Sequence, residues 1–179
     1  MTITIPAPDG IDAAGRSAVI WVPSIEDINA PTVAEITAGT HLSCAIAGFE
    51  PTVSQNTVTS RKYCEKQSTE TPGIPAYSIP PLRVLDDPQG DDTNGQYDYL
   101  DDLYQGAKGF IVNRRGLDMD DEVVSGQKCT IYPVELGAPL EVPLDLTADS
   151  QKFEIEYAVF VTGEVVHGAI IGGVSEPVG

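Results

Sequence analysis

Residues 93–115, TNGQYDYLDDLYQGAKGFIVNRR, restrict the architecture most, because they contain the one helical pattern in a chain of strand patterns. On a helical wheel one side is apolar, with Tyr97, Leu100, Leu103, Tyr104 and Ala107, and the other carries Asp98, Asp101, Asp102 and Gln105. This stripe has the width expected of a helix that lies on a sheet. The pattern predicts a helix over residues 94–107 and, directly after it, a strand from Phe110. One such helix covers one sheet face, so we expect it to pack on the outside of a β-rich domain.

Alternation of apolar and polar residues marks the strands. It is clearest at 151–162, where every second residue is apolar: Phe153, Ile155, Tyr157, Val159 and Val161. Gly163 then predicts a turn into a final strand at 164–172 that pairs back as a hairpin. Weaker patterns predict strands at 17–22, 32–36, 41–46, 52–66, 76–85 and 127–137. Together they predict a mainly β fold, a β-sandwich or barrel-forming sheet with a single α-helix packed on the outside.

The 179 residues have the length of one domain, and 17 glycines with 14 prolines suit strands and turns. We expect an extended N-terminal arm at 1–16, a single β domain at 17–172 and a C-terminal tail at 173–179. Within the domain, residues 52–85 are expected to form a long hairpin. Its second strand is interrupted by Pro80 and Pro81, which cannot donate to a ladder.

The segment 52–66 has the length and threonine content of a strand, but both of its faces are polar. Two sets of side chains alternate along it: Gln55, Thr57, Thr59 and Arg61, and Ser54, Asn56, Ser60 and Lys62. A strand of an ordinary sandwich has apolar residues at every second position. A strand that is polar on both faces fits either the wall of an aqueous channel or a hairpin that protrudes into solvent.

The formal net charge is −17, from 27 acidic and 10 basic residues. Phosphate binding needs clustered lysine and arginine, and the basic residues are scattered, so the composition excludes a conventional DNA binder. Cys44, Cys64 and Cys129 show no CxxC spacing and are expected to be reduced and mostly buried, as in a protein that folds in a cytoplasm. We find no signal-peptide pattern and no apolar run of membrane-spanning length.

The sequence contains no motif that indicates catalysis, a metal site or a cofactor site. His41 and His167 are the only histidines, and each lies in a strand pattern where a structural or surface role is expected. The cysteines lack zinc-ligand spacing, and the acidic runs at 86–92 and 118–122 lack the EF-hand pattern and are expected to be solvated loops. We therefore expect a protein that is not an enzyme and needs no cofactor.

Several segments between about residue 32 and residue 170 follow one another in a recognisable order. They are AEITAG at 34–39, the long polar strand, LYQGAKGFIVNRRG at 103–116, GQKCTIYPVELG at 126–137 and FEIEYAVFVTGEVVHGAI at 153–170. This order resembles the major tail protein, or tail tube subunit, of long-tailed, siphovirus-like bacteriophages, in particular those of actinobacteria.

The resemblance implies hexameric rings that stack into a tube around an inner β-barrel made of strands from all six subunits, which would satisfy open strand edges. It implies that the polar strand faces the lumen, with Gln55, Thr57, Thr59 and Arg61 as candidate lumen residues, although no family motif fixes these positions. Contacts between subunits or rings are expected at Ile3, Ile5, Thr69, Pro72 and Ile74. Further implied partners are the tape measure protein, the tail terminator and distal tail proteins, in a virion tail assembled in the host cytoplasm.

The acidic composition fits such a tube, because DNA must slide through it without specific binding and a negative wall repels its phosphates. The same acidic loops would equally serve solubility on the outside. Three alternatives stay open: another virion β-protein, such as a capsid decoration protein or tail terminator; the tube protein of a contractile injection system; or a stand-alone β-sandwich binding module. None of these involves membrane insertion.

Overall fold

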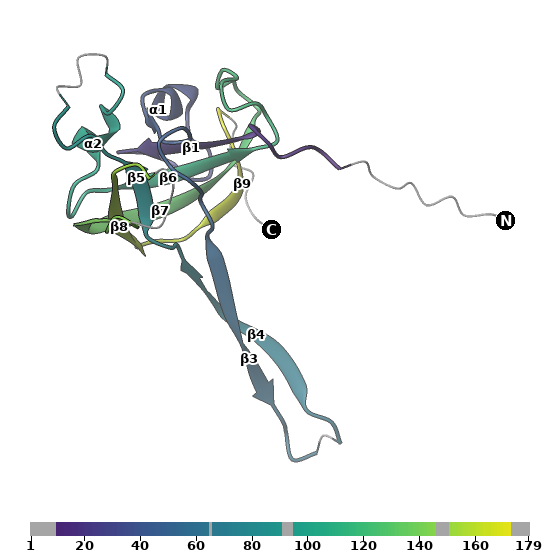
Figure 1. Cartoon of the computed structure of the whole chain (residues 1–179). Coiled ribbons are helices and arrows are strands. Elements are labelled where there is room, and N and C mark those ends of the chain that lie inside the picture. The colour runs from purple at the N-terminus through teal and green to yellow at the C-terminus, as the bar shows by residue number, and fades with distance from the viewer. Residues whose placement is uncertain (1–9, 65, 91–94, 146–150, 173–179) are drawn as a thin grey trace.

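The computed structural model describes residues 10–64, 66–90, 95–145 and 151–172, and its mainly β fold confirms the prediction (Figure 1). The elements are β1 (Ser17–Val22), α1 (Val33–Thr37), β2 (Thr40–His41), β3 (Thr52–Ser60), β4 (Thr69–Ser78), β5 (Leu82–Leu85), α2 (Tyr99–Asp102), β6 (Lys108–Arg115), β7 (Lys128–Glu141), β8 (Glu154–Val161) and β9 (Val166–Ile170). One sheet has the order β2-β1-β6-β7-β8-β5, with β9 also paired to β7. We call this sheet and the helices the body. β3 and β4 form a separate hairpin.

β7 is the central strand and is long enough to hold three neighbours. β6 pairs along one of its edges, and the other edge is shared by β8, which pairs with residues 134–141, and β9, which pairs with 128–131. The hairpin predicted at Gly163 is therefore wrong, because β9 continues along β7 past the end of β8. The Thr162 amide donates to the Pro133 carbonyl at 2.9 Å and keeps the chain on this edge.

The sheet is curled, and backbone contacts link its two end strands. A β-bridge joins Ile46, which follows β2, to Val84 of β5, and the Leu85 amide donates to the Ala45 carbonyl at 2.9 Å. The outer edge of β5 is thereby covered from the opposite end of the sheet. Inside the curl lies the larger core, which includes Trp21, Leu42, Val84, Ile111, Tyr132, Leu136 and Tyr157.

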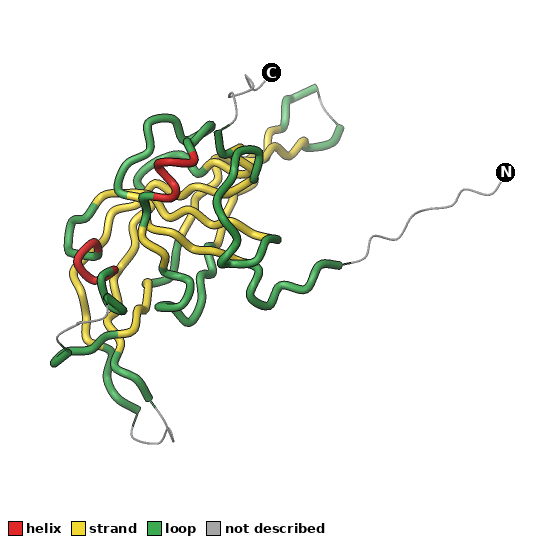
Figure 2. Tube along the Cα trace, turned by 90° about the horizontal axis from the view of Figure 1, so that it is seen from above, coloured by secondary structure: helices red, strands yellow, loops and turns green. Residues whose placement is uncertain are grey.

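A second core lies on the other face of the sheet. β1 serves both cores by alternation, since Ile20 and Val22 pack in the second core while Val19 and Trp21 pack in the first. Gly109 lets β6 approach this strand closely, because a Cβ there would lie 2.8 Å from the Trp21 indole. Figure 2 shows both helices at the periphery of the strands.

The predicted strand at 32–36 is wrong, because these residues begin α1. The Thr32 hydroxyl accepts from the Glu35 amide at 3.2 Å, and the Glu35 carboxylate accepts from the Thr32 amide at 2.7 Å. This capping box satisfies amides that the first helical turn leaves open and outweighs the strand preference of the segment. Ile36 then packs in the second core. Of the next predicted strand, 41–46, only His41 belongs to β2, and a turn follows it.

The helix predicted at 94–107 is much shorter, because only Tyr99–Asp102 is helical within residues 95–107, and residue 94 lies outside the described residues. The sheet competes for the following residues: the Gly106 amide donates to the Leu136 carbonyl of β7 at 2.7 Å, and Gly106 has a positive φ of 81°. Tyr99 and Leu103 are still buried, whereas Tyr104, predicted on the same apolar side, is 61% exposed. None of the helices in the described ranges is long or apolar enough to span a membrane.

The cysteines differ in exposure. Cys129 is buried in the second core, and burial raises the pKa of its thiol to about 11. Cys44 and Cys64 are exposed, so the prediction of mostly buried cysteines is wrong. Both sit on irregular segments, where the sequence carries no burial periodicity.

Candidate assembly surface

The β3–β4 hairpin stands away from the body (Figure 1), and β3 is exposed at every residue. Its polar side chains help to hold it together without a core. Three threonine hydroxyls, those of Thr52, Thr69 and Thr71, donate to carbonyl oxygens of the opposite strand at 3.2 to 3.3 Å. In the single chain, the polar segment is therefore a protruding hairpin.

Three of the four candidate lumen residues share one face of the β3–β4 hairpin. Strand alternation places Gln55, Thr57 and Thr59 together, and their partners on β4 are Pro75, Pro72 and Glu70. β4 has one residue more than β3 between these pairs, and the Gln55 amide group donates to the Gly73 carbonyl at 2.7 Å at this bulge. Arg61 lies just beyond the end of β3.

The residues predicted to contact other subunits fall into two groups. Thr69 and Pro72 lie on β4, and Ile74, at the bulge, is 91% exposed. The hairpin thus brings these three onto the same strand. Ile3 and Ile5 lie outside the described residues.

The two outer edges of the β3–β4 hairpin differ in a way that matters for pairing. Edge strands are normally protected by prolines, charges or bulges. β4 has two prolines, Pro72 and Pro75, the bulge and the charged Glu70. β3, with the sequence TVSQNTVTS, has no proline and no charge, and five of its residues are β-branched: Thr52, Val53, Thr57, Val58 and Thr59. The outer edge of β3 is therefore open to another strand.

The tip of the β3–β4 hairpin carries a basic group, although the basic residues are scattered along the sequence as a whole. Arg61, Lys62 and Lys66 supply three of the ten basic residues within six positions, although the chain as a whole is acidic. Tyr63 between them is fully exposed. The short spacing was visible in the sequence, but only the hairpin shows that these residues stand at the end of a projection (Figure 1).

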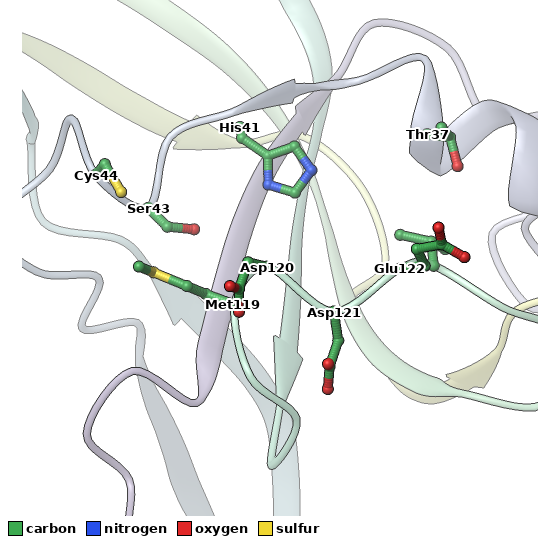
Figure 3. Close-up of a pocket in the computed structure, with 9 residues that line it drawn as sticks. Thr37, His41, Ser43, Cys44, Met119, Asp120, Asp121 and Glu122 are labelled. Atoms are coloured by element: carbon green, nitrogen blue, oxygen red, sulfur yellow. The ribbon is translucent and has the colours of Figure 1, made fainter.

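An acidic cleft of about 610 Å³ lies on the body (Figure 3). It is lined by Thr37, His41, Ser43 and Cys44, and by Met119, Asp120, Asp121, Glu122 and Val123. Partial burial, and then the charge of Arg114, lower the pKa of His41 below its ordinary value. Among the described residues, no three histidine, cysteine or acidic side chains gather closely enough to hold a metal ion.

Arg114 organises the acidic loop of this cleft from the inside. Arg114 is 1% exposed, and its guanidinium donates to the carbonyl oxygens of Asp118 at 3.0 Å, Asp121 at 2.8 Å and Glu122 at 3.2 Å. It also donates to the Gln127 side chain at 3.1 Å. The loop carbonyls therefore face inward, and the cluster around Arg114 is a structural one.

An exposed two-stranded hairpin with an open edge, on a body whose own end strands are linked, offers another chain a strand to pair with. The sequence matches the phage tail tube protein family over residues 5–174, and the chain belongs to this family. The protein is thus a structural component of a phage tail and of the virion.

Other comparisons add little to this assignment. No curated protein matches the sequence. A chain in a cryo-EM structure of the anti-feeding prophage baseplate, symmetrised six-fold, is similar at a TM-score of 0.45 with 11% identity, covering 92% of this chain and 98% of that one. A TM-score below 0.5 is too low to support an argument about fold or function.

Proposed function

We infer that the protein is the tail tube subunit of a siphovirus-like phage of an actinobacterial host. Its rings are hexamers that stack into a tube, and the tube conducts the genome DNA without binding it specifically. The main observation that supports this proposal is the unprotected outer edge of β3. Pairing β3 with a strand of the neighbouring subunit would remove an edge that otherwise invites aggregation, and repetition of that contact closes a ring.

The faces of the β3–β4 hairpin suit a conduit wall. Gln55, Thr57 and Thr59 offer hydroxyl and amide groups that hold water, and Glu70 lies on the same face. None of these is a cation, and Arg61, just beyond the end of β3, is the one candidate lumen residue that could form an ion pair with phosphate. Together with acidic side chains of the body, this face would form the weakly adhesive, acidic lumen that moving DNA requires.

The remaining contacts, those between subunits, between rings and with other tail proteins, are assigned from the positions of the residues in the chain and of the subunit in the tube. Thr69, Pro72 and Ile74 of β4, with Ile3 and Ile5, are proposed to touch neighbouring subunits or rings. At the two ends of the tube the partners are the terminator and the distal tail proteins, and the tape measure protein occupies the lumen before DNA does.

Electron microscopy of the concentrated protein, alongside its mass in dilute solution, tests this function. The wild type should form rings or hollow tubes. Val58→Lys places a charge in the middle of β3 and should prevent ring formation, because lysine in an edge strand blocks pairing. Val124→Lys, an equally exposed valine on the body, is the matched control and should assemble.

Other results would favour the alternatives. A trimer or a single ring that does not stack would indicate a decoration protein or terminator, and a persistent monomer would indicate a binding module. Tubes from Val58→Lys would show that β3 is not the pairing edge. Tubes that require a sheath protein beside them would indicate a contractile system.

A further inference from the structure

Four aromatic rings join the root of the β3–β4 hairpin to the body. The Tyr77 hydroxyl, on β4, lies 3.0 Å from Nε2 of His167, on β9, and their ring centroids are 5.6 Å apart. His167 meets Tyr132 of β7 edge-on at 6.4 Å, and Tyr132 meets Phe49 in the same manner at 5.5 Å. Phe49 precedes β3, so the chain of rings reaches both connections of the hairpin. We call Phe49, Tyr77, Tyr132 and His167 the root clamp.

A β-bulge in β9 points His167 at the β3–β4 hairpin. Cys129 pairs with Ala169 and Thr130 pairs with His167, which leaves Gly168 as an extra residue with a φ of +73°. In a regular strand His167 would share a face with Ala169, which is buried in the second core. The bulge moves the imidazole to the opposite face, where it reaches Tyr77.

Little else fixes the direction of the β3–β4 hairpin. Among the described residues of β3 and β4, Tyr77 alone has a side-chain hydrogen bond to the body. A hollow of about 270 Å³ separates the two connecting segments, 47–50 and 79–82. The nine residues of β3 span about 30 Å, so a tilt of roughly 10° at the root would move the tip by about 5 Å.

We propose that the root clamp sets the angle between the β3–β4 hairpin and the body, with His167 as the positioning residue. The hydrogen bond to Tyr77 holds β4, and the edge-on ring contacts extend the same constraint to Phe49 beside β3. The hairpin then leaves the body in one direction before any partner binds.

The consequence for assembly rests on the proposed tube function. A subunit whose hairpin already points correctly loses less conformational freedom on docking. If the root clamp is loosened, only a fraction of the subunits has the hairpin in the orientation that docking requires. The apparent affinity between subunits is then reduced to that fraction of its full value. The angle itself, however, is a property of the free subunit and can be measured without assembly.

The exposed cysteines allow this measurement in the full chain. Spin labels on Cys44, on the body, and Cys64, at the hairpin tip, report the angle as a distance by pulsed electron paramagnetic resonance. The buried Cys129 thiol should stay unlabelled. We expect one narrow distance distribution in dilute wild-type protein. Tyr77→Phe and His167→Leu should widen it at least about twofold, because the hairpin is a long lever.

Tyr104→Phe, which removes a hydroxyl from an exposed tyrosine outside the clamp, is the matched control and should leave the distribution narrow. Circular dichroism spectra must show that all variants are folded. A broad wild-type distribution, or narrow distributions in both clamp variants, would overturn the proposal. A narrow wild-type distribution in a protein that never forms rings would instead leave the clamp in place and contradict the tube function.

Discussion

Arg114 is the residue whose role is easiest to isolate, because its neighbour Arg115 is an exposed arginine on the same strand. Arg114→Met should lower the free energy of unfolding by about 2–4 kcal/mol, since it leaves several part-buried carbonyl oxygens of the acidic loop without the guanidinium donors. Arg114→Lys should recover only part of this loss, because an ammonium cannot fork to several carbonyls. Urea denaturation measures the effect.

Arg115→Met is the control for this prediction and should change stability by less than about 0.5 kcal/mol. If the two methionine variants were equally stable, the loop would not depend on the guanidinium. Limited proteolysis gives a second view, since cleavage within 116–127 should be faster in Arg114→Met than in Arg115→Met.

At the residue scale, part of the site could be predicted from the sequence. Alternation alone places Gln55, Thr57 and Thr59 on one face, because it depends only on strand geometry. The partnership of Tyr77 with His167 could not be predicted, since the two residues are 90 positions apart and meet through a bulge. The role of Arg114 in the acidic loop could not be predicted either, because most of its partners are backbone carbonyl groups, which have no sequence signature.

At the scale of elements, α1 offers a test that depends on pH. The hydrogen bond from the Thr32 hydroxyl, and then those from the backbone amides of Glu26 and Thr32, hold the pKa of the Glu35 carboxyl below its ordinary value of 4.5. A depressed carboxyl pKa stabilises the folded state above the unfolded value, and this contribution is lost as pH falls through the folded value. Glu35→Gln should therefore be less stable than wild type at pH 7.

The stability difference between wild type and Glu35→Gln should shrink as pH falls below about 4.5. Chemical denaturation at a series of pH values measures it. Glu50→Gln, at an exposed glutamate, serves as the control for the general effect of a lost charge. A difference that is constant across this pH range would show that the carboxylate does not act through its ionised form.

The elements that were predicted wrongly fail for a shared reason. In α1, a cap formed by two side chains outweighs the strand preference of the residues between them. In α2, amphipathic periodicity continues to residue 107, but β7 takes the backbone groups of Gly106 and Ala107 for the sheet. In both cases residue propensity is weaker than specific hydrogen bonds, which come from within the segment in α1 and from a distant strand in α2.

At the scale of the whole molecule, the net charge of −17 should control the rate of assembly. Subunits of like charge repel one another, and the Debye length falls from about 30 Å at 0.01 M salt to about 8 Å at 0.15 M. We therefore expect the rate of tube formation, followed by light scattering with electron microscopy of the products, to rise over this range of sodium chloride.

Sucrose at matched osmolality is the control and should not accelerate assembly in the same way. A rate that falls with salt would show instead that attraction dominates, for example between the basic hairpin tip at 61–66 and an acidic face of a neighbour. Either dependence should disappear at high salt, where both repulsion and attraction are screened.

The sequence by itself determined the mainly β fold, the two polar faces of the segment at 52–60 and the acidic charge, because each follows from side-chain period and composition. It also carried the resemblance to tail tube subunits that the family match supports. Only the tertiary structure decided that β9 extends along β7, that β2 and β5 are linked through Ile46 and Val84, and that His167 faces the hairpin. These features depend on which distant segments compete for the same strand edge, and no local pattern records the outcome of that competition.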